Sequence, residues 1–317
     1  APTASLPSLE GRRVAVVGAG PAGLSAATEA AARGAQVTLF EASDELGGQF
    51  NLAKRVPGKE EFYETLRYFS TLLQERGVEL KLSTRASVAL LREGGFEDVI
   101  VATGVIPRPL SFEGAPEGKV VGYTEVLRGE VEVGERVAII GAGGIGFDVA
   151  EFLLSASQQG DEAPKADLNE YLKTWGIDLS YQEGSGLTKP APHPPQRTLY
   201  LLQRSEGKLG AKLGKTTGWI HRAQLKQGEV TMLSGVSYDR VDELGLTITH
   251  KGEARALEVD HVVICAGQQS SRGLFDELEA EAQRGGPRAH LIGGALKAGE
   301  VDAKRAIREG YLCARAL

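Results

Sequence analysis

Two stretches of this sequence are nearly the same: "VAVVGAGPAGL" runs from Val14 to Leu24, and "VAIIGAGGIGF" runs from Val137 to Phe147. In each copy an apolar run leads into glycines and then into helix-favouring residues, which predicts a strand, a tight turn and a helix start. This order is typical of a dinucleotide-binding unit. One copy alone is weak support, but two copies predict two such units in a chain of 317 residues.

The glycines of the first copy have the spacing G-x-G-x-x-G. Gly18 permits the tight turn, Gly20 lets the backbone approach a pyrophosphate, and Gly23 lets the helix pack on the strand. The N-terminus of the helix favours the same anion. Glu41 ends the next predicted strand, where a carboxylate can accept hydrogen bonds from ribose hydroxyls. A glycine-rich turn without a ligand is the alternative, which these features together disfavour. The predicted dinucleotide contacts are Gly18, Gly20, Pro21, Ala22, Gly23 and Glu41.

The second copy differs at the end of its following strand. That strand ends in Gln203-Arg204 and not in an acid. A carboxylate here would repel a 2′-phosphate, whereas Arg204 would pair with it. A charge-assisted bond of about 1.5–3 kcal/mol favours NADPH over NADH by roughly 10- to 150-fold. A solvated surface arginine is the alternative. The predicted contacts of this unit are Gly141, Gly143, Gly144, Ile145, Gly146, Arg204 and Lys215.

The order of predicted elements indicates an α/β fold. Strands alternate with helices after each glycine turn, which implies parallel sheets. The tail returns to an apolar strand, "HLIGGAL", and a final helix, so we expect the chain to re-enter its first domain. We predict two Rossmann-like dinucleotide-binding domains, the second inserted into the first. The first spans 10–126 and 286–317, and the second spans 127–285 with a polar insertion at 155–196, either a functional lid or a solvated loop.

Composition excludes several classes of function. A net charge of −6 argues against a nucleic-acid surface, and no apolar run approaches the roughly 18 residues of a membrane helix. The first residues lack the pattern of a signal peptide, and the absence of an initial Met fits a start inside a longer gene product. Two cysteines, Cys265 and Cys313, suit a reducing, cytoplasmic setting.

Two further segments carry a family resemblance. "ELGGQF" covers Glu45–Phe50, and "VIVATGVIPR" covers Val99–Arg108. With the two glycine turns, they resemble the two-dinucleotide-binding flavoprotein superfamily, whose first domain holds FAD and whose second holds the nicotinamide nucleotide. The resemblance implies hydride transfer from nicotinamide to flavin. It adds expected FAD contacts at Gly47, Gly48, Gln49, Ala102, Thr103 and Gly104.

A more specific resemblance rests on longer segments. "GGQFNLAKRVPGKEEFYETLRYF" (47–69), "LGKTTGWIHR" (213–222) and "VVICAGQ" (262–268) resemble the C-terminal part of bacterial NADPH-dependent 2,4-dienoyl-CoA reductases, which are related to trimethylamine dehydrogenase. In that family electrons pass from NADPH to FAD, through an iron–sulfur cluster to FMN in an N-terminal barrel, and then to the dienoyl thioester. The resemblance implies FAD and NADPH as cofactors and an FMN/iron–sulfur barrel domain or subunit as the electron acceptor.

The chain departs from that family in two places. Two cysteines cannot ligate a four-cysteine cluster, so we do not expect diene reduction from this chain alone. Relatives also place an Asp near the glycines of the last strand, at the flavin's ribityl chain. Here carboxylates follow only at Glu300 and Asp302, so FAD is held less tightly or a backbone N–H substitutes. The remaining expected contacts in the resembling segments are Arg55, Gly267, Gly293 and Gly294.

Other residue patterns limit the chemistry. There is no Cys-x-x-Cys pair, which argues against a disulfide reductase of the thioredoxin reductase kind, and the scattered histidines suggest no metal site. Trp219 and His221 either border the nicotinamide or fill a domain interface. No general base is assigned, because hydride transfer needs none. The alternative function is a nucleotide-binding scaffold that holds ADP or NADP without hydride transfer.

Overall fold

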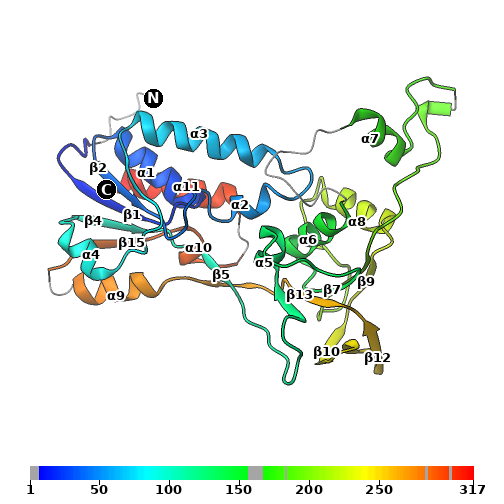
Figure 1. The fold of residues 1–317 in the computed structure, drawn as a ribbon. Helices are drawn as coiled ribbons and strands as arrows, with labels where there is room; N and C mark the ends of the chain where they lie inside the picture. The colour runs from blue at the N-terminus through cyan, green and yellow to red at the C-terminus, as the bar shows by residue number, and fades with distance from the viewer. Residues whose placement is uncertain (1–6, 156–166, 183, 283–284, 300–301) are drawn as a thin grey trace. The chain divides into compact units, whose positions relative to one another are not determined.

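The computed structural model describes residues 7–155, 167–182, 184–282, 285–299 and 302–317 (Figure 1). The chain forms two compact units. Unit 1 consists of Ala1–Lys54, Glu60–Arg108 and Gln268–Leu317, and unit 2 consists of Arg55–Lys59 and Pro109–Gly267. Unit 2 is therefore inserted, in the order of the chain, into unit 1.

Unit 1 is built on a sheet of five parallel strands (Figure 1). Their order is β15 (Arg288–Leu291), β4 (Asp98–Val101), β1 (Arg13–Val17), β2 (Gln36–Phe40) and β3 (Glu79–Lys81). The central strands β1 and β4 are apolar, and their side chains from Val14 and Val99 onward are buried, as expected of a parallel sheet covered on both faces.

Helices α1 (Pro21–Ala32) and α11 (Ala303–Ala316) lie side by side in unit 1 (Figure 1). A Cβ atom at Gly310 would overlap the carbonyl oxygen of Ala22, and Ser25 Oγ donates to the carbonyl of Ile307 at 2.9 Å. Small residues on α1 permit this close approach. The other helices of unit 1 are α2 (Phe50–Ala53), α3 (Glu61–Glu75), α4 (Val88–Glu93), α9 (Gly273–Ala282) and α10 (Gly293–Leu296).

The segments of unit 1 meet at Asp98, at the start of β4. Its side chain is fully buried and pairs with Arg12, with Arg288 at 3.1 Å and with His290 at 2.9 Å. Arg12 also donates to the backbone carbonyl of Leu317. One carboxylate thus joins the strands near the N-terminus to the segment that returns after unit 2.

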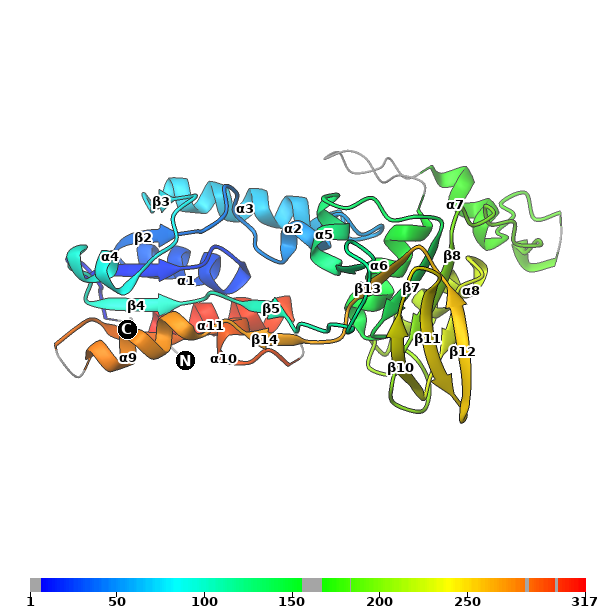
Figure 2. The ribbon, with the colours of Figure 1, turned by 60° about the horizontal axis from the view of Figure 1, so that its bottom comes forward.

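Unit 2 repeats the sheet of unit 1. Its five parallel strands are, in order, β6 (Val120–Gly122), β13 (His261–Ile264), β7 (Arg136–Ile140), β8 (Thr198–Leu202) and β9 (Thr231–Leu233). Between β9 and β13 the chain forms an antiparallel sheet, seen in Figure 2, of β10 (Val236–Val241), β11 (Gly245–His250) and β12 (Glu253–Glu258). Leu246 and Ile248 bury one face of this small sheet. The helices of unit 2 are α5 (Tyr123–Arg128), α6 (Gly144–Leu154), α7 (Leu168–Trp175), the short 3₁₀ turn Gly184–Gly186 and α8 (Gly218–Gln227).

The structure confirms the predicted α/β class with two parallel sheets, and it returns the C-terminal segment to the first sheet, where β15 pairs with β4. The bounds of the units differ from the predicted 126/127 and 285/286. The strand β6 pairs with β13, which places 120–126 in unit 2, whereas β14 (Gln268–Ser270) pairs with β5 (Val105–Pro107) in unit 1.

The predicted insertion at 155–196 is described in part, since 156–166 and 183 lie outside the described residues. The described part of the insertion from Asp167 onward is not a purely polar loop. It contains α7, which exposes Leu168 and Tyr171, and Tyr181 is exposed beyond it. Across the ranges that the structure describes, no helix has both the length and the apolar character needed to cross a membrane.

Candidate nucleotide-binding sites

The two glycine turns occupy equivalent positions in the two sheets. In unit 1 the N–H of Gly18 donates to the carbonyl of Phe40, and in unit 2 the N–H of Gly141 donates to that of Leu202, both at 2.8 Å. Each turn follows the central strand, β1 or β7, at the carboxyl edge of its sheet. This edge is where α/β folds bind ligands.

The first and third glycines of each turn are required by sterics. Gly18 and Gly141 have φ of +105° and +113°, which favours glycine, and a Cβ there would press on the backbone of Ala102 or Cys265. A Cβ on Gly23 or Gly146 would overlap the carbonyl oxygen of Gly18 or Gly141 respectively. The four glycines therefore let each helix begin against its strand.

The middle glycines face open space. A Cβ built on Gly20, Gly143 or Gly144 meets no described atom within 4 Å. Gly20 and Gly143 are the N-caps of α1 and α6, and in the described residues neither helix has a side-chain cap hydrogen bond. Uncapped N–H groups beside an open backbone suit an anionic pyrophosphate. Both turns therefore fit a dinucleotide.

The other predicted contacts in unit 1 surround the first turn. Glu41 follows β2, and its carboxylate accepts hydrogen bonds from the N–H of Ala19 at 2.7 Å and of Ser43 at 2.9 Å. The N–H of Gly47 donates to the carbonyl of Ala19 at 2.9 Å, and a Cβ on Gly48 would lie 3.1 Å from the Cα of Gly20. Glu41 and the Gly47–Gln49 turn are thus placed against the glycine turn.

The ends of β4 and β15 close the same region. Ala102 follows β4 and lies against Gly18, and Thr103 donates to the carbonyl of Ser271. A Cβ on Gly294 would lie 3.1 Å from the carbonyl carbon of Gly104, and one on Gly293 would lie 2.8 Å from the Cβ of Ala22. The structure therefore gathers the contacts predicted in unit 1: Gly18, Gly20, Pro21, Ala22, Gly23, Glu41, Gly47, Gly48, Gln49, Ala102, Thr103, Gly104, Gly293 and Gly294.

Sequence reasoning missed Glu309 in this region. Its carboxylate accepts a hydrogen bond from the N–H of Gly293 at 2.7 Å and pairs with Arg305 at 3.2 Å. The N–H of Gly293 is therefore engaged within the protein, at the place where a backbone N–H was expected as one substitute for the missing Asp. Of the two carboxylates noted near these glycines, Asp302 caps α11 through the N–H of Lys304, and Glu300 lies outside the described residues.

In unit 2, Gln203 occupies the place of Glu41. The N–H of Glu41 donates to Lys81 O at 2.9 Å, and that of Gln203 donates to Leu233 O at 3.0 Å, so each residue takes the same place after the strand that follows the glycine turn, β2 or β8. A neutral amide thus stands where unit 1 has a carboxylate. Arg204, the next residue, is exposed.

Arg204 also lies near Tyr238 of β10. Burial raises the pKa of the Tyr238 phenol, the positive charge of Arg204 opposes part of this rise, and together they bring the pKa to about 12. The N–H of Val236, at the start of β10, donates to the carbonyl of Gln203 at 3.1 Å. The small antiparallel sheet therefore begins beside the residue that replaces the acid.

Three more predicted contacts belong to unit 2 but are not part of its glycine turn. Lys215 is exposed in the segment before α8, and Gly267 ends the unit with its N–H donating to Cys265 O at 3.1 Å. The Arg55 guanidinium donates to the carbonyl of Leu127 at 3.1 Å. Arg55 was expected as a cofactor contact without a choice of cofactor, and it belongs to unit 2.

Two acidic side chains of helix α6 have partners that sequence reasoning did not find. Asp148 accepts hydrogen bonds from Lys59 Nζ at 2.6 Å on both carboxylate oxygens. One turn further, Glu151 is buried and its Oε1 lies 2.7 Å from His221 Nδ1. Their spacing of three on α6 was visible in the sequence, but their partners were not.

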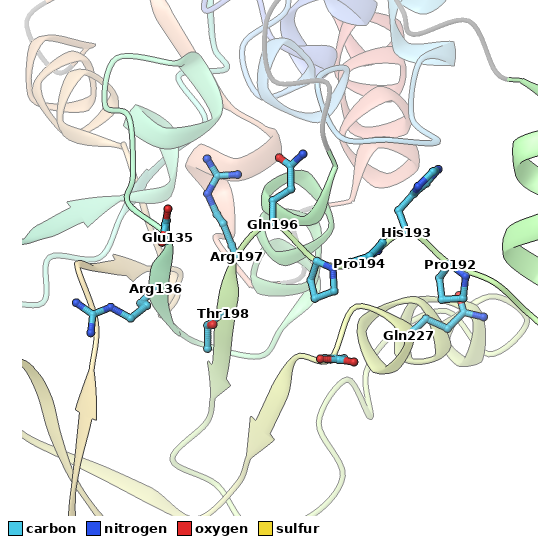
Figure 3. A pocket seen from close by; sticks show the side chains of 11 residues that line it. Glu135, Arg136, Pro192, His193, Pro194, Gln196, Arg197, Thr198 and Gln227 are labelled. Atoms are coloured by element: carbon cyan, nitrogen blue, oxygen red, sulfur yellow. The ribbon is translucent and has the colours of Figure 1, made fainter.

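A separate hollow of about 680 Å³ lies at the opposite edge of the sheet of unit 2 (Figure 3). Arg136 and Thr198 line it at the starts of β7 and β8, and Pro192–Arg197 form one wall. Figure 3 shows the side chains of Arg136 and Arg197 pointing in different directions. Because the glycine turn is at the other end of these strands, the hollow is not the predicted nucleotide site.

A family comparison agrees with this geometry. The family model described as "Pyridine nucleotide-disulphide oxidoreductase" matches residues 12–289, which include both glycine turns. The chain belongs to this family. Membership makes the chain an α/β flavoprotein oxidoreductase of a family that uses FAD and a pyridine nucleotide.

The curated relatives of this chain are longer than the chain itself. It is 28% identical over 96% of its length to a "Metal reductase" of Desulforamulus reducens, of which the match covers 44%. It is 30% identical over 90% of its length to a "Cinnamate reductase" of Clostridium sporogenes, of which the match covers 36%. The chain thus spans less than half the length of these two relatives.

Solved structures share the fold. A 2-naphthoyl-CoA reductase complex has a TM-score of 0.78 at 23% identity, with 99% of this chain and 41% of that chain covered. Thioredoxin reductase from Lactococcus lactis has a TM-score of 0.65 at 18% identity, with 96% and 97% covered. These likenesses extend over both units of the chain.

The two cysteines of the chain lie in different units. Cys265 is buried in unit 2, and Cys313 is partly buried in unit 1. Burial raises the pKa of both thiols, that of Cys313 to about 11. Thiols that stay protonated at neutral pH are poor nucleophiles, so neither has the properties of a redox-active cysteine.

Proposed function

We propose that the chain is an electron-input module that binds FAD in unit 1 and NADPH in unit 2, as in 2,4-dienoyl-CoA reductases. The duplicated turn carries this proposal: both copies offer an open middle glycine at an uncapped helix N-terminus. Bound FAD would accept a hydride from the nicotinamide and release the electrons to a second acceptor.

Each unit contributes a different contact at the adenosine ribose. In unit 1, Glu41 is placed to accept hydrogen bonds from ribose hydroxyls, in addition to those from Ala19 and Ser43. In unit 2, Gln203 presents no negative charge, and the neighbouring Arg204 is available to a 2′-phosphate. This difference supports FAD in the first site and NADPH in the second.

The proposed acceptor is an FMN/iron–sulfur barrel domain or subunit. The relatives are named for acceptors of unrelated chemistry: a metal, cinnamate and bilirubin. A region common to proteins with such different acceptors is better suited to supplying electrons than to binding the acceptor. We therefore propose that the partner domain or subunit, and not this chain, binds and selects the final substrate, including any dienoyl thioester.

Anaerobic reduction tests this function. The purified chain, loaded with FAD, is mixed with NADPH or with NADH, and the flavin absorbance is followed by stopped flow. We expect rapid bleaching by NADPH and slower bleaching by NADH. A flavin that neither nucleotide reduces, although NADP⁺ binds, would favour the scaffold alternative over hydride transfer.

Substitution of Arg204 tests whether this residue makes the chain prefer NADPH over NADH. Arg204→Ala is expected to reduce the preference for NADPH over NADH by roughly 10- to 150-fold, the effect of one charge-assisted bond. Dissociation constants of both nucleotides, measured by fluorescence titration, check this. Arg255→Ala removes an exposed positive charge from β12 of the same unit and serves as the control. Equal ratios in wild type and Arg204→Ala would leave Arg204 as a solvated surface residue.

A further inference from the structure

The carboxylate of Glu151 is buried, although the proposed transfer of electrons from NADPH to FAD requires no acidic side chain at its position. It lies on α6, the helix whose N-terminus follows the second glycine turn, and its side chain is only 6% exposed. Its Oε1 lies 2.7 Å from Nδ1 of His221 on α8. A buried carboxylate without a partner is costly, so this contact holds α8 against α6.

The segment before α8 also packs against α6. A Cβ on Gly210 would lie 2.8 Å from the ring of Phe147, in the first turns of α6. Arg222, the neighbour of His221, donates to the carbonyl of Gly210 at 3.1 Å. Figure 1 shows α8 beside α6. The segment 210–219, which includes the first two residues of α8, is thus anchored beside the helix that begins at the second glycine turn.

The same segment presents side chains that suit a nucleotide. Trp219 is 59% exposed, unusual for so large an aromatic side chain, and Lys212 and Lys215 are exposed as well. An exposed indole can stack on a planar ring, and two ammonium groups attract phosphates. His221 is itself only 27% exposed and is engaged by Glu151. It is therefore poorly placed to be a direct contact.

We propose that the contact between Glu151 and His221 holds the Lys212–Trp219 segment against α6. In this position Trp219, Lys212 and Lys215 contact the dinucleotide bound at the second glycine turn. This inference rests on the proposed binding of NADPH in unit 2. It gives His221 and Glu151 positioning roles and gives Trp219 a direct one. Burial raises the pKa of the Glu151 carboxyl, and His221 counteracts this shift.

Variants at His221 separate positioning from folding. His221→Ala removes the partner of Glu151 and is expected to weaken NADPH binding about 10-fold, the effect of one hydrogen bond to a charged group. His221→Asn keeps an N–H donor near the position of Nδ1 and is expected to restore most of the affinity. Trp219→Ala removes the exposed ring and is expected to weaken binding without changing the melting temperature. His250→Ala on β11 of unit 2 is the matched control.

The readouts are the NADPH dissociation constant, the KM and kcat of flavin reduction, FAD content, and hydrogen exchange of residues 209–220. The expected result is a higher KM at unchanged kcat, with faster exchange in that segment for His221→Ala. Wild-type NADPH affinity in His221→Ala with unchanged exchange would overturn the positioning role. If the wild-type chain binds no NADPH, the proposed function itself fails. Unchanged affinity in Trp219→Ala would overturn the direct role of the indole.

Discussion

Replacing Asp98 with asparagine is expected to lower the free energy of unfolding by about 3–5 kcal/mol. The Asp98 side chain is fully buried, and the variant would leave Arg12 and Arg288 without the charge that compensates theirs. The two arginines belong to segments that meet only after the chain has passed through unit 2. Because asparagine is close in volume, the loss would come from charge and not from a cavity. Urea unfolding, followed by circular dichroism, measures this free energy.

A surface pair on the same unit provides the control. Asp276 on α9 pairs at 2.9 Å with Arg272, the residue before that helix, and both side chains are about half exposed. Exposed pairs of this kind contribute little to stability. Asp276→Asn should therefore leave the urea midpoint nearly unchanged. Equal effects of Asp98→Asn and Asp276→Asn would show that burial of the Asp98 cluster does not determine stability.

Alanine at the third glycine of each turn is expected to separate the two sites. In Gly146→Ala the new methyl overlaps the carbonyl oxygen of Gly141, so α6 must move away from its strand. A displacement of about 1 Å at a nucleotide site can lower the rate about 100-fold. We expect FAD content to remain near wild type, while flavin reduction by NADPH falls by about that factor.

Gly23→Ala places the same overlap in unit 1, against the carbonyl oxygen of Gly18. This variant is expected to lose FAD on purification and to keep its affinity for NADPH. FAD is quantified by absorbance after denaturation, and NADPH binding by fluorescence. Loss of both cofactors in both variants would contradict the assignment of one cofactor to each unit.

The middle glycines show whether such losses come from the fold or from the ligand. Gly20 and Gly143 face open space, so Gly20→Ala and Gly143→Ala are expected to change the free energy of unfolding by less than about 0.5 kcal/mol. A pyrophosphate that approaches the backbone would nevertheless meet the added methyl. Weaker binding at unchanged stability would identify these positions as direct contacts.

The sequence by itself determined the duplicated turns and the fold class. Gly23 and Gly146 are recognisable because a Cβ on either would overlap the carbonyl oxygen of the glycine that opens the same turn, and such a local requirement appears as fixed spacing. The alternation of strands and helices likewise predicted two parallel sheets. Both are local patterns, which is why one sequence sufficed.

Tertiary structure alone decided which distant residues meet. Only the register of the two sheets shows that Gln203, and not Arg204, occupies the place of Glu41. The Glu309 contact with Gly293 depends on how α11 packs, and the Glu151–His221 pair on how α8 packs on α6. The bounds of the units likewise depend on strand pairing across the insertion, through β6 and β14. No periodicity or motif encodes such contacts, because they are made by segments that become neighbours only when the sheets and helices have packed together.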